Sequence, residues 1–343
     1  MEKVTAIGLD LAKTSFQVHG VDSRGHRVLR KNLRRSQVAE FFAQLPSCVV
    51  GMEACGSAHY WARKLTSMGH EVRLIAPQFV KPYVKTHKTD AADAEAICEA
   101  VERPNMRFVP IKTPDQQAIL SVHRVREGYV KARTALANQI RGLLTEYGII
   151  FQKGIWSLTK SHQILEQADD LPGIFKQLIE MQLRHLQEIE ERILETEHQI
   201  QRWHRDNEAS QRLMAIPGVG ILTATAMTAS VGDAKQFKNS HQMAAWLGLV
   251  PRQHSTGGKP TLLGISKRGD VYLRKLMIHG ARSVLCAAQN RSGAEKSWHM
   301  QVMRRRNHNV AAVALAHKNA RTIWAILSKE SKYDQTHRLP AAA

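Results

Sequence analysis

The first 110 residues show an order of strand and helix patterns that few folds accommodate. Three apolar runs typical of strands come first, and the second and third are joined by a turn at Asp22–Gly25 with no helical segment between them. Helical and strand patterns then alternate, with Ser36 placed to cap the first helix and Gly69 to end the second. The predicted segments are strands at 4–12, 15–21, 26–33, 48–53 and 71–77, and helices at 36–45, 57–69 and from about residue 90 onwards.

Three consecutive strands followed by alternating strands and helices form the element order of a ribonuclease H-like fold, which belongs to the α/β class. We therefore expect residues 1–112 to form such a domain. Two acidic residues of its strands, Asp10 and Glu53, can be neighbours in the sheet. Asp90 and Asp93 stand where the last helix begins, three residues apart, and share one face of that helix.

The overall charge makes these four carboxylates unusual. Lys and Arg total 49 against 30 Asp and Glu, which gives a net charge of +19. Mg²⁺ or Mn²⁺ takes oxygen ligands and bridges to phosphate, and two ions can serve the attacking and leaving oxygens of strand cleavage. We expect Asp10, Glu53, Asp90 and Asp93 to be catalytic and to hold two such ions. The structural alternative is a turn for Asp10, a strand end for Glu53 and helix capping for the aspartate pair.

The excess of positive charge indicates a polyanionic partner. Apolar runs are far shorter than a membrane span, and the N-terminal residues lack the pattern of a signal peptide. The four cysteines show no CxxC spacing and are typical of reduced thiols, so neither zinc nor disulfides are indicated. We therefore expect a cytoplasmic protein with no membrane partner.

Residues 113–208 carry two heptad-like stretches, joined by a segment at 148–173 that is marked by glycine and proline. Seven of nine seam positions are apolar in each stretch, which is typical of a coiled coil. We expect a helical spacer that dimerises the chain, and a hairpin that buries both stripes within one chain is the alternative. The predicted seams are Ile119, Val122, Arg126, Tyr129, Arg133, Leu136, Ile140, Leu143 and Tyr147, then Phe175, Ile179, Gln182, Leu186, Ile189, Ile193, Thr196, Ile200 and Trp203.

A third region, residues 209–330, is rich in glycine, alanine and basic side chains and is followed by a tail at 331–343. Its run IPGVG precedes a helix of small residues, a pattern typical of a helix-hairpin-helix turn whose backbone N–H groups meet a phosphate. Gly218 and Gly220 are therefore candidate nucleic-acid contacts. A plain turn between packed helices is the alternative.

A loop in the same region combines hydroxyl groups, glycines and cations. Ser255 and Thr256 stand beside Gly257 and Gly258. Such a setting is typical of a nucleophile among phosphate-binding cations, and an ordinary polar loop is the alternative. The candidate phosphate-binding residues around the loop are Arg252, Lys259, Lys267 and Arg268.

The motifs GLDLAK, GMEACG and KTDAADA, followed by IPGVG, AAWLGLVPRQ and STGGK…GISKRGD, resemble the DEDD transposases of the "one-ten" insertion-sequence family. The resemblance runs nearly from end to end, and the family includes the Piv-type DNA invertases and the RNA-guided bridge recombinases. It implies a RuvC-like domain that carries the acidic tetrad, a helical spacer and a C-terminal transposase domain. By this resemblance, the family's tetrad corresponds to Asp10, Glu53, Asp90 and Asp93.

The resemblance also implies a serine that attaches covalently to DNA and completes a composite active site with the tetrad. We assign this role to Ser255, with Thr256 as the alternative nucleophile. Further implications are a circular DNA intermediate, double-stranded DNA as substrate and a structured noncoding guide RNA that pairs with donor and target. The chain would act as a homo-oligomer, a dimer or a tetramer assembled on DNA.

Three rival functions remain open. A hydrolytic junction or flap nuclease on the same fold would use water in place of the serine. An actin-like kinase or ATPase is suggested by GLDLAKTS, but the missing second glycine-rich phosphate motif and the charge of +19 disfavour it. A DNA- or RNA-binding protein without catalytic activity would need a purely structural tetrad.

Overall fold

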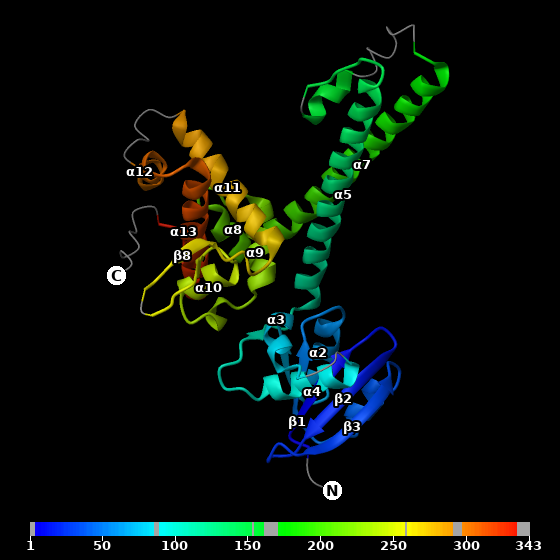
Figure 1. The fold of residues 1–343 in the computed structure, drawn as a ribbon, viewed down its shortest axis with the longest axis vertical. Helices are drawn as coiled ribbons and strands as arrows, with labels where there is room; N and C mark the ends of the chain where they lie inside the picture. Colours follow the sequence, from blue (N-terminus) through cyan, green and yellow to red (C-terminus); the bar gives the residue numbers. More distant parts are fainter. Residues whose placement is uncertain are drawn as a thin grey trace. The chain divides into compact units, whose positions relative to one another are not determined.

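The computed structural model describes residues 4–85, 89–152, 154–160, 171–257, 259–290 and 297–334. The chain divides into two compact units, Met1–Thr113 and Pro114–Ala343, both drawn in Figure 1. The first unit is built on a mixed α/β sheet and the second is mainly helical, which confirms the expected class of each part. None of the described helices is long and apolar enough to pass through a bilayer.

A six-stranded sheet forms the centre of the first unit, with the strand order β3-β2-β1-β4-β5-β6. The first three strands are antiparallel neighbours, as their close succession in the sequence predicts. β4 runs parallel to β1 and β5 parallel to β4, while β6 closes the far edge in the antiparallel direction. The strands are β1 (Ala6–Leu11), β2 (Ser15–Val21), β3 (Arg27–Arg34), β4 (Val49–Glu53), β5 (Glu71–Ile75) and β6 (Phe108–Val109).

Helices cover the two faces of this sheet. α1 and α2 pack on one face, where Leu9, Phe42 and Trp61 belong to the same core. α4 packs on the other face, against β1, β2 and β4. This contact depends on Gly8, because a Cβ at that position would lie 2.0 Å from the carbonyl oxygen of Ala94. The helices are α1 (Val38–Ala43), α2 (Ala58–Thr66), α3 (Pro77–Val80), the 3₁₀ turn η1 (Lys81–Tyr83) and α4 (Asp90–Val101).

The predicted capping role of Ser36 is wrong. α1 begins at Val38, and its N-cap residue is Gln37, which makes no side-chain capping bond. The Gln37 side chain instead accepts a hydrogen bond from the backbone N–H of Arg34, at 2.9 Å, and so closes the loop that follows β3. Ser36 therefore lies before the helix, where its hydroxyl lines a surface groove.

Two long helices, α5 (Pro114–Thr145) and α7 (Gly173–Arg205), form a hairpin in the second unit (Figure 1). They are antiparallel, since Arg126 pairs with Glu197 and Tyr147 stacks on Phe175 near the other end. Seven of the nine predicted seam positions of α7 are buried. On α5 the buried residues are Ile119, His123, Leu136, Ala137, Ile140 and Leu144, which matches the predicted seam only in part. The segment 161–170 between the helices lies outside the described residues.

The remaining helices of this unit pack around a second large core (Figure 1). Polar contacts join α5 to it: His123 bonds to Tyr272 at 2.9 Å and to Thr225 at 3.0 Å, and Lys275 contacts Glu127 at 2.6 Å. The elements are α8 (Glu208–Met214), α9 (Ile221–Val231), η3 (Ala234–Gln236), α10 (Ser240–Trp246), β7 (Pro251–Gln253), β8 (Leu262–Ile265), α11 (Val271–Gln289), α12 (Trp298–Arg305) and α13 (His308–Lys329). The 3₁₀ turn η2 (Ile155–Lys160) belongs instead to the core of the helical hairpin, where Leu158 is buried.

Candidate active site

Two of the predicted catalytic carboxylates lie at neighbouring strand ends. β1 and β4 are parallel and in register up to the pair Leu9–Met52. Asp10 and Glu53 are the next residues of these two strands, so they stand side by side at the carboxyl edge of the sheet. Side chains alternate along a strand, and Gly8 faces α4, so Asp10 points to the α4 face as well. Both carboxylates are half-buried.

The other two carboxylates lie in the first turn of α4. Asp90 is exposed, and Asp93 is half-buried one turn further along. The helix is capped by Thr89, whose hydroxyl accepts a hydrogen bond from the backbone N–H of Ala92 at 3.2 Å. Neither aspartate is therefore needed as the N-cap, and the capping alternative for this pair loses its main support.

Electrostatics connects all four carboxylates. Burial is the main cause that raises the pKa of Asp10 from 3.8 to about 6, and the negative charges of Asp93, Asp90 and Glu53 raise it further. A backbone hydrogen bond from Leu11 acts in the opposite direction. The four predicted residues are thus close enough for the negative charges of Asp93, Asp90 and Glu53 to act on the carboxyl group of Asp10.

The carboxylates share this edge of the sheet without forming a closed ligand cluster. Among the described residues, no three Asp, Glu, His or Cys side chains approach closely enough to hold one ion. The donor set nevertheless suits a hard divalent cation, because it consists of carboxylate oxygens. Cys55 lies near the carboxylates, and burial together with the charges of Glu53 and Asp10 raises the pKa of this thiol. A protonated thiol is a poor ligand for any metal.

Two residues that support this site were not predicted from the sequence. Gly8 lets α4 approach β1, and Thr89 fixes where α4 begins. Their signals were available in the sequence. A glycine stands two residues before Asp10, and a threonine directly precedes Asp90.

The predicted nucleophile lies in the hairpin of β7 and β8, in the second unit. The Oγ atom of Ser255 accepts a hydrogen bond from the side-chain amide of Gln253 at 2.9 Å. The hairpin narrows at Thr256 and Lys259, which form an isolated bridge, and both are exposed. Gly257 has a φ of +56°, in the region that favours glycine. Gly258 lies outside the described residues.

Two of the predicted phosphate-binding cations lie along this hairpin, and the other two lie at its base. Arg252 and Lys259 are exposed along it. Lys267 and Arg268 follow β8 and pack at its base, where the backbone N–H of Lys267 donates to the carbonyl of Gly248 at 3.1 Å. The four side chains therefore belong to one exposed hairpin and its base, together with the two candidate hydroxyls.

The two glycines of the IPGVG turn have different surroundings. Gly218 has a φ of +87°, and a Cβ there would lie 2.7 Å from the carbonyl oxygen of Gly280 on α11. This glycine permits a close contact between two backbones. Gly220 is the exposed N-cap of α9, and a Cβ there would meet nothing within 4 Å. Only Gly220 thus has the exposure that a phosphate contact at a helix N-terminus needs.

Comparisons with known proteins identify the family of the chain. Residues 7–149 match a family model described as a transposase, and residues 210–297 match the model of the transposase IS116/IS110/IS902 family. The chain is 55% identical to a "Probable family 20 transposase" of Pseudomonas aeruginosa, over 96% of this chain and 98% of the relative.

Two further relatives are also matched over nearly their whole length. The chain is 43% identical to the transposase for insertion sequence element IS1111A of Coxiella burnetii, over 97% of this chain and 92% of the relative. It is 42% identical to the transposase for insertion sequence element IS1328 of Yersinia enterocolitica, over 98% and 100% of the two chains. The chain therefore belongs to the IS116/IS110/IS902 family of transposases and is a DNA transposase.

Proposed function

We propose that this transposase cuts and rejoins DNA with its four carboxylates as the catalytic acidic set and with Ser255 as the nucleophile. One observation carries the proposal. At the carboxyl edge of the sheet, the negative charges of Glu53, Asp90 and Asp93 all act on Asp10 and raise its pKa, in addition to the effect of burial. The charges that act on Asp10 are those of the three other carboxylates, and the backbone hydrogen bond from Leu11 offsets the raised pKa only in part.

The sheet order supports a ribonuclease H-like, RuvC-like assignment for the first unit. Three antiparallel strands are followed by two parallel ones, and the acidic residues lie at the ends of β1 and β4 and on the helix that covers them. We also propose the finer division into a catalytic domain (1–112), a spacer (113–208), a transposase domain (209–330) and a tail (331–343). The tail from residue 335 lies outside the described residues.

Mg²⁺ or Mn²⁺ suits this donor set, and Asp10, Glu53, Asp90 and Asp93 would hold it. When bound, such ions supply Lewis-acid stabilisation of charge at the phosphate and lower the pKa of an attacking hydroxyl. By holding such ions, the carboxylates would determine where the reacting phosphate binds, at the end of β1. Their mutual repulsion, which adds to the effect of burial in raising the pKa of Asp10, favours occupation of the site by positive charge.

In the proposed step, the Oγ atom of Ser255 forms a bond to phosphorus as the bond from phosphorus to the leaving sugar oxygen breaks. The hydroxyl proton ends on that sugar oxygen. The phosphodiester is exchanged and not hydrolysed, so its reversal rejoins DNA without ATP. The exposed hairpin, with Arg252 and Lys259 beside the serine, supports a role at an anionic substrate.

Trapping of the protein on DNA tests this step. Wild-type protein and a Thr256→Ala variant should give a protease-sensitive adduct with DNA that carries the element ends, whereas Ser255→Ala should bind the DNA and give none. If Thr256→Ala alone loses the adduct, the nucleophile is Thr256. If both variants cleave without any adduct forming in the wild type, water is the nucleophile and the protein is a hydrolytic nuclease.

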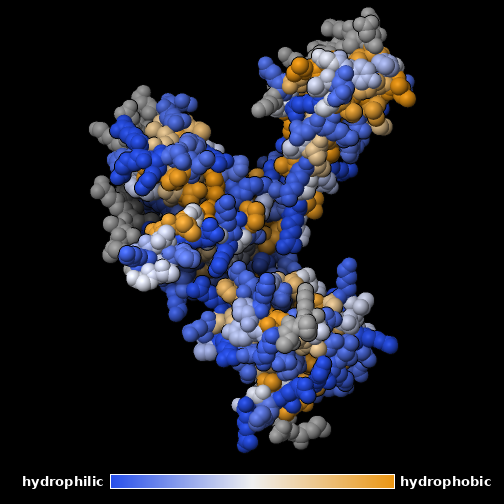
Figure 2. All heavy atoms as spheres, in the orientation of Figure 1, coloured by the Kyte–Doolittle hydropathy of each residue, from blue (hydrophilic) through white to orange (hydrophobic). Residues whose placement is uncertain are grey.

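We also propose that the chain forms a dimer through its helical hairpin and that it binds a structured guide RNA. The helical hairpin exposes apolar side chains at the end where α5 stops and α7 begins, and Figure 2 shows hydrophobic atoms there. Ile150 is 83% exposed, Ile174 81% and Met181 50%. Solvated apolar groups in one place favour burial against a partner, here the same hairpin of another copy. The net charge of +19 supports RNA as well as DNA binding.

Dimerisation through this end predicts a change in mass on substitution. Ile174→Glu should shift the protein towards monomers in light scattering, because burying a carboxylate without a partner opposes association. Leu194→Glu is the matched control, since Leu194 is also exposed but lies about 30 Å along the same helix. Equal masses for all three proteins would contradict this interface.

A further inference from the structure

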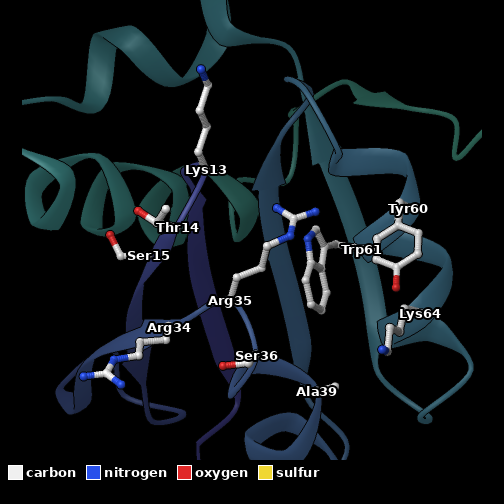
Figure 3. A pocket seen from close by; sticks show the side chains of 10 residues that line it. All are labelled: Lys13, Thr14, Ser15, Arg34, Arg35, Ser36, Ala39, Tyr60, Trp61 and Lys64. Carbon is white, nitrogen blue, oxygen red and sulfur yellow. The ribbon is translucent and has the colours of Figure 1, made fainter.

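A groove of about 810 Å³ lies in the first unit, apart from the four carboxylates (Figure 3). It is formed by the turn between β1 and β2, the end of β3, and helices α1 and α2. None of its ten lining residues is acidic. The lining residues are Lys13, Thr14, Ser15, Arg34, Arg35, Ser36, Ala39, Tyr60, Trp61 and Lys64.

Two cations of the groove, Arg35 and Lys64, lie against an aromatic ring and are not neutralised by a carboxylate of the described residues. The guanidinium of Arg35 lies 5.5 Å from the ring centre of Trp61, and the ammonium of Lys64 lies 5.6 Å from the same ring. Figure 3 shows Arg35 beside the indole. Among the described residues, neither these two nor Lys13 and Arg34 form a salt bridge with a carboxylate. The charges of Arg35 and Lys64 beside the indole are therefore available to an anion, while Lys13 and Arg34 line the rim of the groove and point away from the ring in Figure 3.

The floor of the groove carries a further polar group. Trp61 is only 3% exposed, and its indole N–H has no hydrogen-bond partner among the described residues. A buried donor without an acceptor costs free energy, but the ring nitrogen has almost no accessible surface, so an anionic oxygen would reach it only after the side chains above it move. Hydroxyls of Thr14, Ser15 and Ser36 add donors along the groove. This combination of cations and hydroxyl donors is typical of contacts to phosphates of a nucleic-acid backbone.

The groove lies close to the acidic residues along the chain. Lys13 follows Asp10 by three residues, so their Cα atoms are at most about 11 Å apart. That span corresponds to about three nucleotides of a DNA strand. The groove lies on the α1 and α2 face of the sheet and the carboxylates on the α4 face, but both are at the end where β1 stops.

We propose that this groove binds the phosphate backbone of the substrate DNA, a few nucleotides from the phosphate held at the acidic set. Its residues position the strand and do not react with it. This assignment rests on the proposed function for the choice of DNA over RNA. The aromatic floor and its stacked cations form a rigid surface over which the strand leaves the cleavage point.

A binding measurement on the full chain tests the groove. The variant Lys13→Ala/Arg34→Ala/Lys64→Ala is compared with wild type by fluorescence anisotropy on a duplex DNA of about 30 base pairs, with EDTA present so that nothing is cut. We expect affinity to fall at least about tenfold, and the dependence of log affinity on log salt to lose about two to three units of slope, one per lost contact.

A matched control removes three other cations of the same sheet. Arg24→Ala/Arg27→Ala/Arg30→Ala takes away equal charge from exposed positions on β3 and the turn before it, away from the groove. Its affinity should stay within about threefold of wild type and keep most of the salt slope. Equal losses in both triple variants would show that only net charge matters and would overturn the groove.

Two further comparisons make the result decisive. Lys13→Ala/Arg34→Ala changes only exposed side chains and should retain the wild-type circular dichroism spectrum while losing most of the affinity, which excludes unfolding as the cause.

A single-stranded RNA of the same length is the second ligand. Loss on RNA with unchanged DNA affinity would overturn the assignment to DNA. Because the assay involves no cleavage, its outcome is separate from that of the Ser255 and Asp10 variants.

Discussion

At the scale of single residues, His123 illustrates a group whose role the sequence does not reveal. The heptad pattern placed Val122 in the seam of α5, whereas the structure buries His123 next to it, between Tyr272 and Thr225. Those partners lie more than 100 residues away in the sequence and belong to other helices. Burial, followed by the charge of Arg126, lowers the pKa of His123 to about 4. The ring is therefore neutral in the folded protein at physiological pH.

This lowered pKa predicts how stability depends on pH. In the unfolded chain His123 binds a proton below about pH 6.5, whereas in the folded protein it binds one only near pH 4. The contribution to stability is therefore complete above the unfolded pKa and is lost as the pH falls towards the folded one. Between pH 7.5 and 5 the loss is about 2 kcal/mol.

Urea unfolding of His123→Gln should show a correspondingly smaller fall in the free energy of unfolding over this pH range. His26→Gln is the control, because the side chain of His26 is 71% exposed. A pH dependence of His123→Gln equal to that of wild type would contradict the burial of a neutral imidazole.

At the scale of elements, apolar periodicity predicted one helix better than the other. α7 buries most of its predicted stripe, against α5 and also against α8 and α9. α5 packs on α7 and also on α9, so its buried stripe changes phase between partners, which a single heptad register cannot represent. The groove beside Trp61 was likewise not predictable, since its residues come from three separate segments of the sequence.

The two glycines of the IPGVG turn have different roles, although they belong to the same motif. Gly218→Ala should lower the free energy of unfolding by at least about 2 kcal/mol, because the residue has a positive φ and its Cβ would meet the Gly280 carbonyl. Gly220→Ala should cost no more than about 1 kcal/mol, since its surroundings are open. Denaturant titration of both variants measures this difference. Equal costs would mean that the backbone contact between Gly218 and Gly280 is absent.

At the scale of the whole molecule, the chain combines a mixed α/β unit that carries the carboxylates with a helical unit that carries the hydroxyl hairpin. The class of each unit and the grouping of the four carboxylates followed from the sequence, because strand ends and a helix start are local patterns. The contacts that depend on packing between distant segments did not follow, among them Gly8 against Ala94 and Gly218 against Gly280.

Strand cleavage by variants of the acidic set tests the central claim most directly. With Mg²⁺ and DNA that carries the element ends, Asp10→Asn and Glu53→Gln should lose at least about a thousandfold in cleavage rate, because charge at the phosphate is no longer stabilised. Both should still bind the DNA, and Glu40→Gln, an exposed carboxylate on α1, should cleave like wild type. Cleavage at the wild-type rate by Asp10→Asn or Glu53→Gln would contradict the account.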